Sequence, residues 1–447
     1  MDTITHGIAG ALIGKALFRG DDLFALRPMN RQRIVTWATM LGAIFPDADT
    51  FRDMLSRNEL LVITWHRSVT HSLLCLPIFA LLLAAITYWF ARARKWEAPS
   101  FAALTGLYAA GILSHILLDL VTTFGTMIWS PLKWSRPAWD LIFIVDFTFT
   151  GILLVPQILP WIQERPEKGL RRALISLAVA VIAMFGIQAL GNYVGAPVST
   201  PAVFLFDVIL AAVFLLPLRV TNQITEKKSA KKSRSKLTRD ARISERNLEK
   251  LEGQTFSRSE KANEVQAQSV MRRRWNLAGL VGACGYLTLA IFAHHAALVR
   301  VKHFAEMQKL NVQLLGALPF PPSLWRWDGL VRTDRGVYEV RLDLSQRSPF
   351  ESPADANRSE RPAVTYRFYP EAYPNPYITA ARELPEVQKV LWFDRYPVTH
   401  YHLEQGEPVV EISDIRFPQI KPKNPSPFTY QVRFDPTGKV LSQGFLK

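Results

Sequence analysis

The first half of the chain places histidines and aspartates inside or beside strongly apolar stretches. They are His6, Asp47, Asp49, His66, His71, His115, Asp119, Asp140 and Asp146. Because an ionisable side chain in an apolar or lipid environment costs free energy, each of them is a candidate for function. Imidazole and carboxylate groups bind divalent cations such as Zn²⁺, Mn²⁺ and Fe²⁺. The residue types therefore predict a metal site.

The spacing of two pairs suits metal ligation. His115 and Asp119 stand four residues apart in the segment GILSHILLDL, so a helix there puts both side chains on one face. Asp47 and Asp49 lie at an expected helix end, where a bend of the backbone aims both carboxylates into one pocket. The alternatives are a structural pair or proton relay for the first two residues, and a loop cap or a salt bridge to Arg52 for the other two.

A third group of candidates lies in the segment HRSVTH, which runs from His66 to His71. The segment spans an expected helix start, for which Ser68 or Thr70 is the predicted cap. Arg67 beside His66 suits phosphate recognition, because a guanidinium binds phosphate oxygens through two parallel hydrogen bonds. The alternative for Arg67 is a salt bridge to one of the two preceding aspartates.

The ligands expected for this site are imidazoles and carboxylates alone. Cys75 and Cys284 both lie in apolar runs, which excludes a cysteine-based zinc site and a disulfide framework. Zn²⁺ is the expected ion, with Mn²⁺ or Fe²⁺ as alternatives. Asp140 suits an interfacial cap, whereas Asp146 lies deeper in its apolar run. The predicted metal ligands are His6, Asp47, Asp49, His66, His71, His115, Asp119 and Asp146.

The elements that must hold these residues are long apolar segments. A bilayer core of about 30 Å needs roughly 20 apolar residues for each helical span. The stretches of that kind are 68–90, 101–124, 141–162, 173–190, 203–218 and 275–299. Two shorter ones, 4–18 and 34–45, suit short spans or a re-entrant pair. The sequence predicts a polytopic α-helical membrane protein with about six to eight membrane segments.

The formal charge of +15 is concentrated in one part of the chain. Residues 219–274 hold 16 Lys/Arg against 7 Asp/Glu, and they lie between two apolar segments. Basic loops in that position mark the cytoplasmic side of a membrane protein. If the remaining loops are assigned alternately to the two sides of the membrane, the cytoplasmic loops hold 27 Lys and Arg residues and the outer loops hold five. The distribution of charge therefore predicts the membrane topology of the chain. We expect no nucleic-acid partner.

This topology has two consequences for the site and for the tail. The histidines and aspartates fall near the outer ends of their segments, in one layer, which predicts an outward-facing site. The last 150 residues or so fall outside the membrane, where β-type runs at 337–344, 364–369 and 430–434 alternate with Pro, Gly and Asn turns. The expected organisation is a membrane domain with the site at 1–160, further transmembrane helices at 161–218, a basic cytoplasmic linker at 219–274, a last transmembrane helix at 275–299 and an extracytoplasmic β-rich domain at 300–447.

Other catalytic motifs are missing from the sequence. It contains no HExxH, no glycine-rich phosphate loop and no GxSxG. His294 and His295 in the last apolar segment suit a structural role. His400 and His402 share one face of an expected strand and suit an exposed surface.

Four sequence blocks resemble the YdjM-type family of bacterial inner-membrane, metal-dependent hydrolases. The blocks are THGIAGALIG, IFPDADT, WHRSVTHSLL and GILSHILLDLVTTFGTMIWSPLKW, which occur in this order within residues 1–160. Thr50 stands where the family's acidic block PDxDH has a histidine. The resemblance implies a location in the bacterial inner membrane and a divalent metal as the cofactor.

The family is itself similar to zinc-dependent phospholipase C and to the fungal zinc nucleases, all-helical enzymes that cleave phosphoesters at a His/Asp metal cluster. The resemblance implies a ligand order that runs along this chain as follows: His6, Asp47, His71 or His66, then His115 with Asp119. Those enzymes also use an amino-terminal Trp and a later His/Glu set, which are not in place in this sequence, so we expect one or two metal ions and not a three-metal centre.

The expected function is that of a membrane-bound hydrolase which cleaves a phosphoester of a lipid or lipid-linked substrate. A bound Zn²⁺ lowers the pKa of its water from about 16 toward 7. Asp47 or Asp49 is the expected acceptor of the water's proton, and Arg67 the expected phosphate ligand. One rival is a transporter that uses His115 and Asp119 as a proton relay. The other is a non-catalytic envelope protein with a structural metal site, whose tail binds a partner.

Overall fold

The structure is a computed structural model, and its helices and strands follow the apolar pattern of the sequence. It describes residues 1–18, 28–50, 60–96, 99–164, 166–193, 200–201, 203–215, 249–321, 323–346, 366–417, 426 and 428–446. These residues divide into two compact units. The first comprises Met1–Gly14, Phe18–Thr150 and Ala283–Lys447, and the second comprises Lys15–Leu17 and Gly151–Gly282.

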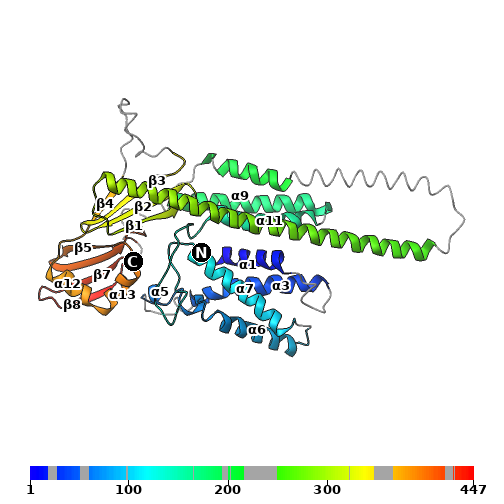
Figure 1. The fold of residues 1–447 in the computed structure, drawn as a ribbon, viewed down its shortest axis with the longest axis horizontal. Helices are drawn as coiled ribbons and strands as arrows, with labels where there is room; N and C mark the ends of the chain where they lie inside the picture. Colours follow the sequence, from blue (N-terminus) through cyan, green and yellow to red (C-terminus); the bar gives the residue numbers. More distant parts are fainter. Residues whose placement is uncertain are drawn as a thin grey trace, which may run out of the picture. The chain divides into compact units, whose positions relative to one another are not determined.

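Four helices form the N-terminal part of the first unit (Figure 1). They are α1 (Thr3–Leu17), α3 (Pro28–Ile44), α6 (Leu76–Ala93) and α7 (Phe101–Leu120). Asp2 caps α1 by accepting from the Thr5 backbone N–H, and Ser100 caps α7 in the same way, as short polar side chains do at helix starts. Three short elements connect them: the 3₁₀ turn η1 (Phe45–Ala48), helix α5 (Leu60–Thr64) and the 3₁₀ turn η2 (Val69–His71).

Helices α3 and α7 pack at very short range because glycines face each other. A Cβ atom on Gly111 would lie 2.3 Å from the backbone oxygen of Thr39 and 2.8 Å from the backbone nitrogen of Ala43. A Cβ on Gly42 would lie 2.7 Å from the backbone oxygen of Tyr108. Small residues allow helix backbones to approach closely. This contact fixes the end of α3, which leads into η1, against the end of α7.

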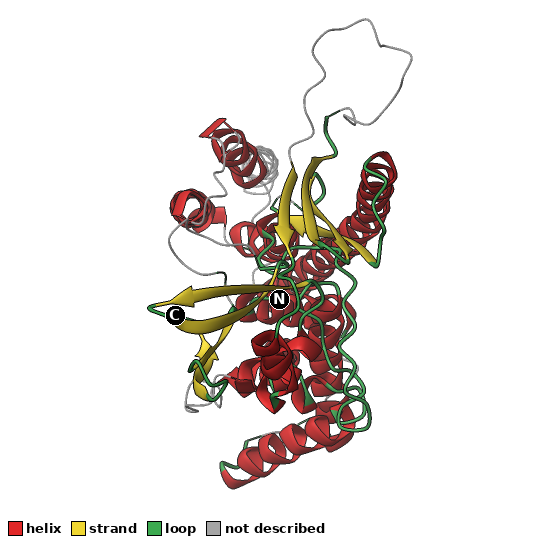
Figure 2. Ribbon diagram, turned by 90° about the vertical axis from the view of Figure 1, so that its left-hand side faces the viewer, coloured by secondary structure: helices red, strands yellow, loops and turns green. Residues whose placement is uncertain are grey.

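The C-terminal part of the first unit holds two antiparallel sheets, each with four strands in chain order (Figure 2). The first sheet comprises β1 (Leu314–Phe320), β2 (Arg326–Thr333), β3 (Gly336–Asp343) and β4 (Tyr366–Pro370). The second comprises β5 (Pro397–Glu404), β6 (Glu407–Asp414), β7 (Tyr430–Phe434) and β8 (Val440–Phe445), with helices α12 (Pro376–Glu383) and α13 (Pro385–Phe393) between the sheets in sequence. The predicted β-rich tail is confirmed.

The first sheet packs against the end of the long helix α11 (Glu249–Met307). Val301 and Phe304 of the helix share a buried core with Trp327, Val331 and Val340 of the sheet. His294 on the same helix stacks on Trp327, with ring centroids 5.4 Å apart, which agrees with the expected structural role.

The C-terminal part also shares a core with the loops of the N-terminal helices. Ile63 and Phe124 are buried with Val387, Phe393 and other side chains of α13 and the second sheet. Arg395 forms two hydrogen bonds with the Asp140 carboxylate, at 2.9 and 2.8 Å. The β-rich tail therefore contacts the segments that carry the predicted site.

The second unit contains helices with their own core. Its elements are most of α8 (Phe147–Gln163), α9 (Pro166–Tyr193), a helix over Val203–Leu215 and the beginning of α11. The buried core residues are Leu159, Ile162, Ala173, Leu210 and Phe214.

Four of the described helices are long and apolar enough to cross a membrane. They are Leu76–Ala93, Phe101–Leu120, Glu167–Gly186 and Gln268–Met307, and Phe147–Gln163 and Val203–Leu215 are apolar but shorter. Large apolar side chains such as Trp89 and Ile182, each 71% exposed, are typical of a lipid-facing surface. A membrane protein is thus supported, while six to eight segments and the placement of the tail outside stay predictions. The first part of the predicted basic linker, residues 219–248, lies outside the described residues.

Two expected segments begin later in the structure than predicted. The third apolar segment was predicted from residue 68, but its helix α6 begins at Leu76, after a series of turns. The fifth was predicted from residue 141, but α8 begins at Phe147. In both places the apolar run includes residues that form loops around the polar site, so hydropathy overestimated the helix.

We expect Gly111→Ala to destabilise the protein, because its new methyl group would meet backbone atoms of α3 that have no room to move aside. The matched control is Gly106→Ala on the same helix, where a Cβ would meet nothing within 4 Å. Thermal unfolding in detergent should show a lower midpoint for Gly111→Ala, with a cost of about 1–3 kcal/mol, and no loss for Gly106→Ala. Equal midpoints for both variants would contradict the close helix contact.

The first sheet should lose stability as the pH rises. Burial, and then the charge of Glu339, raises the pKa of Asp328 to about 7. The folded protein therefore keeps a proton that the unfolded chain, with a pKa near 3.8, has lost. The free energy of unfolding falls between these two pKa values, by about 1.4 kcal/mol for each pH unit. The urea midpoint should be higher at pH 5 than at pH 8, and Asp328→Asn should reduce that difference. The same pH dependence in both proteins would rule out Asp328 as its source.

Candidate metal centre

Five of the predicted ligands come together in one buried cluster. His6 comes from α1, Asp47 from η1, His71 from η2, and His115 and Asp119 from α7. All five side chains are buried. Their donor atoms form two overlapping groups that could each hold a metal ion: His6, His115 and Asp119, and Asp47, His71 and His115.

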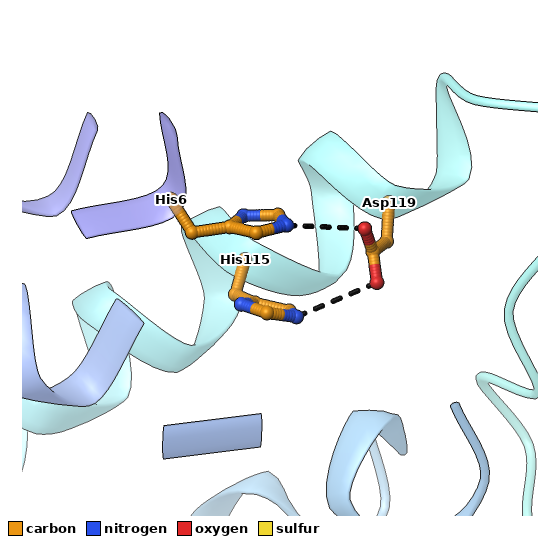
Figure 3. A group of neighbouring side chains, drawn as sticks. All are labelled: His6, His115 and Asp119. Atoms are coloured by element: carbon orange, nitrogen blue, oxygen red, sulfur yellow. Dashed lines mark hydrogen bonds and ion pairs between the residues drawn. The ribbon is translucent and has the colours of Figure 1, made fainter. Parts of the chain in front are cut away.

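The first group is drawn in Figure 3. The His6 Nε2 atom lies 3.1 Å from Asp119 Oδ1, and the His115 Nε2 atom lies 3.4 Å from Asp119 Oδ2. The two imidazole rings are stacked, with centroids 3.6 Å apart and planes 19° from parallel. Both rings therefore direct Nε2 at one carboxylate, as the i, i+4 spacing of His115 and Asp119 predicted.

The second group adds Asp47 and His71 on the other side of His115. Asp47 Oδ1 lies 3.5 Å from His115 Nε2 and 3.8 Å from His71 Nε2. The His71 Nε2 atom is also 3.2 Å from Asp119 Oδ2 and 3.0 Å from His115 Nε2. Two ligands bound at about 2.0–2.1 Å to a tetrahedral Zn²⁺ lie roughly 3.3 Å apart. The donor separations and the donor types therefore fit a divalent metal ion.

Hydrogen bonds outside the cluster orient these ligands. The His115 Nδ1–H donates to the Ala43 carbonyl oxygen at 2.6 Å, which leaves the Nε2 lone pair directed at the cluster. The Thr3 hydroxyl donates to Asp47 Oδ2 at 2.6 Å. The Thr70 hydroxyl lies 3.0 Å from His71 Nδ1. Burial lowers the pKa of His71 to about 4, so its imidazole is neutral, which is the form that binds metal.

Asp49 and His66 lie beside the two groups and shape the loop between them. Asp49 Oδ1 accepts from His66 Nδ1–H, and its Oδ2 accepts from the Arg67 backbone N–H and from the Thr70 hydroxyl, each at 3.0 Å. Burial opposes the ionisation of Asp49, but its hydrogen bonds from His66 and from the Arg67 backbone N–H hold its pKa below the usual value. Asp49 therefore holds the loop in place. This is closer to its predicted role as a loop cap than to its predicted role as a metal ligand. Arg52, the other partner considered, lies outside the described residues.

The expected helix start in this loop was wrong. Ser68 makes no side-chain capping bond, and η2 ends at His71 without continuing into a helix. Arg67 adopts a positive φ of 60°, a conformation that an L-residue rarely takes. The Asp49 hydrogen bonds hold that turn, and the turn brings His71 to the cluster.

Arg67 pairs with a different carboxylate from the two that the sequence suggested. Its Nε lies 3.1 Å from Asp119 Oδ2, and its Nη1 donates to the Thr122 hydroxyl at 3.1 Å. The guanidinium carbon lies 5.0 Å from the centroid of the Phe124 ring. Arg67 is thus a buried cation in direct contact with the cluster.

Asp146 and Asp140 lie apart from both groups. Asp146 accepts from the Phe149 backbone N–H at 2.9 Å and from the Tyr286 hydroxyl at 2.7 Å. The first bond caps α8 and the second ties the α8 start to α11, so the predicted role of Asp146 in metal binding gives way to a structural one. Asp140 pairs with Arg395, as described above, in place of the expected cap.

Several partners of the cluster were not identified from the sequence. Thr3 lies three residues before His6, and the helical repeat indicates that the two side chains share a face. It does not indicate that Thr3 contacts the cluster. The Met1 amine, which contacts Asp119, and the Ala43 carbonyl carry no side-chain signal. Arg136 donates to the His66 carbonyl oxygen across 70 residues of sequence, a contact that spacing does not reveal.

The fold and the cluster define a protein with apolar helices long enough to cross a membrane and a buried His/Asp centre. The model of the protein family described as YdjM inner membrane protein matches residues 1–191. Through this part the chain is similar to the YdjM inner membrane protein family, which confirms the resemblance of the sequence blocks and supports a location in the inner membrane. Searches of curated proteins and of solved structures found no significant match.

Zinc titration of single variants should separate the two groups. His115 belongs to both, whereas His6 belongs to the first and His71 to the second. We expect His6→Ala and His71→Ala each to weaken zinc binding by more than about tenfold, and His115→Ala to weaken it more than either. Isothermal titration of chelator-treated protein in detergent measures this. The control is His402→Ala, an exposed strand residue, which should bind zinc like the wild type. Wild-type affinity in His115→Ala would contradict the shared ligand.

Proposed function

We propose that the chain is a membrane-bound hydrolase that uses one or two divalent metal ions, with Zn²⁺ first among them, to cleave a phosphoester of a lipid or lipid-linked substrate. The observation that carries the proposal is the buried His/Asp cluster, whose donor atoms form two overlapping groups; His115 offers its Nε2 atom alone, so it can ligate an ion in one of the two groups at a time. Paired metal sites act on phosphoesters by holding the attacking and leaving oxygens together. Purely structural sites are usually closed by four ligands around a single ion.

A bound divalent metal would supply a water of lowered pKa and an electrophile for the phosphoryl oxygens. Asp47 is the better candidate for a proton acceptor, because one of its oxygens faces His71 and His115 while the other accepts a hydrogen bond from the Thr3 hydroxyl. Asp49 was the other candidate, but both of its oxygens are committed to the loop. We assign Asp49 to positioning.

Arg67 supplies the positive charge beside the centre. Its guanidinium lies against the Phe124 ring and next to Asp119, so its plane is fixed before any substrate binds. A guanidinium binds phosphate oxygens in a planar fork. In this proposal Arg67 holds a non-bridging oxygen of the phosphoester while it also balances the Asp119 charge.

The site is proposed to face the outside of the inner membrane. The distribution of Lys and Arg supports that side, because the most basic segment of the chain lies on the opposite side of the nearest apolar helices in the predicted topology. Asp47 follows the end of α3, and Asp119 lies in the last turn of α7. In the predicted topology such helix ends lie near the membrane surface, where a lipid-linked substrate is present.

A proton relay is the second candidate function. The direct contact between His71 and His115, at 3.0 Å between Nε2 atoms, and their common neighbour Asp119 favour it. Chains of His and Asp residues carry protons in transporters. A relay predicts transport that depends on a proton gradient, whereas the hydrolase predicts turnover that depends on metal and needs no gradient.

Hydrolysis of bis(4-nitrophenyl) phosphate and of short-chain phosphatidic acid by the detergent-purified protein tests the proposal. We expect Zn²⁺-dependent turnover that a chelator abolishes. Asp47→Asn should lower kcat/KM by at least about 100-fold, the usual loss for a missing acid–base group. Asp334→Asn, which changes an exposed aspartate in the turn between β2 and β3, should have no effect. Absence of metal-dependent turnover with phosphodiesters and phosphomonoesters, despite bound metal, would reject the hydrolase.

A further inference from the structure

We infer that a groove between α5 and α13 binds the apolar chain of an anionic lipid next to the metal centre. The inference rests on the proposed hydrolase and concerns the place where its substrate binds. Binding is measured separately from turnover.

The groove is an open hollow lined mainly by apolar side chains. Its volume is about 610 Å³, within the range of pockets that bind small molecules. The lining includes Leu60, Leu61, Trp65, Trp134, Trp392 and Lys389. The tryptophans come from three separate segments of the first unit, and the Trp392 indole N–H donates to the Trp134 carbonyl oxygen at 3.0 Å. Aromatic side chains with one polar edge favour the boundary between lipid and water.

The groove adjoins the metal centre through the chain itself. Thr64 and Trp65, which line it, are followed directly by His66 and Arg67, whose loop Asp49 holds. A ligand in the groove therefore lies beside the loop that leads to His71.

The charge around the groove selects an anion. Lys389 is its one charged lining residue within the described part of the chain. The Arg136 guanidinium carbon lies 5.8 Å from the ring centroid of Trp392, which lines the groove. The Nε and Nη1 atoms of Arg136 are buried and have no hydrogen-bond partner among the described residues. Buried donors without partners are costly, so this guanidinium has capacity for a phosphate oxygen.

The segment that contributes Trp134 also carries a surface that suits a bilayer. Leu132 is 82% exposed, and Trp129 and Trp139 are exposed beside it. Exposed tryptophans and a large exposed aliphatic side chain on one loop are typical of contact with the membrane interface. A lipid therefore reaches the groove directly from the bilayer. The apolar lining favours a lipid over a soluble anion, because a soluble anion has no apolar chain to bury there.

Native mass spectrometry of the full chain in detergent tests this with two probes, dioleoylphosphatidylglycerol and dioleoylphosphatidylcholine. The wild type should retain the anionic lipid in preference to the zwitterionic one. Gln388→Trp, which fills the groove from an exposed position on α13, should reduce retention of phosphatidylglycerol at least fivefold. Lys389→Gln should remove the preference between the two lipids.

Matched controls are available at exposed positions on β7–β8. Neither Gln443 nor Lys439 lines the groove, so Gln443→Trp and Lys439→Gln should bind lipid like the wild type. Equal retention by Gln388→Trp and Gln443→Trp would overturn the inference. So would a loss of self-association in Gln388→Trp without any lipid effect, because the groove would then bind a second copy of the chain.

Asp47→Asn separates this inference from the proposed function, because it changes the metal centre but not the groove lining, so this variant should retain phosphatidylglycerol like the wild type. Lipid bound in the groove without hydrolysis by the wild type would reject the hydrolase and leave the lipid site standing. If Gln388→Trp hydrolyses substrate at the wild-type rate in a metal-dependent way and retains as much lipid as the wild type, the lipid site is rejected. The hydrolase then remains supported.

Discussion

The Asp119 carboxylate is fully buried in the last turn of α7, where the helix dipole is itself negative. A buried negative charge in that position is costly unless cations and hydrogen bonds compensate it. The structure supplies Arg67, the Met1 amine and two histidine rings at hydrogen-bond or ion-pair distance. The need to compensate this carboxylate explains why polar residues from α1, η2 and α7 converge on one point in an otherwise apolar helical region.

The surrounding fold holds that convergence in place. The glycine contact between α3 and α7 sets the distance between Asp47 and His115, and the Ala43 carbonyl fixes the tautomer of the same histidine. The turn at Arg67 depends on Asp49, which explains why a carboxylate next to the centre serves the loop. The β-rich part then covers the neighbouring loops through Phe124 and Phe393, so the centre and the groove belong to one compact unit.

Local patterns in the sequence predicted the parts of this arrangement that depend on local structure. The helical repeat indicated the shared face of His115 and Asp119, and alternation indicated strands at β3 and β7. The turn at Arg67 was predicted as a helix start, because hydropathy does not register a buried turn held by side-chain hydrogen bonds. The contacts of Arg136 with His66 and Trp392 join segments far apart in the chain, and no spacing rule reaches them.

The central claim is that the buried His/Asp cluster binds a divalent metal ion. Inductively coupled plasma mass spectrometry of detergent-purified protein tests it most directly, with the double variant His115→Ala/Asp119→Ala measured beside the wild type. We expect one or two equivalents of zinc, or of manganese or iron, in the wild type, and loss of the metal in a double variant that still folds. A wild type that holds no metal, even after growth and purification with added zinc, would rule out metal binding by the cluster.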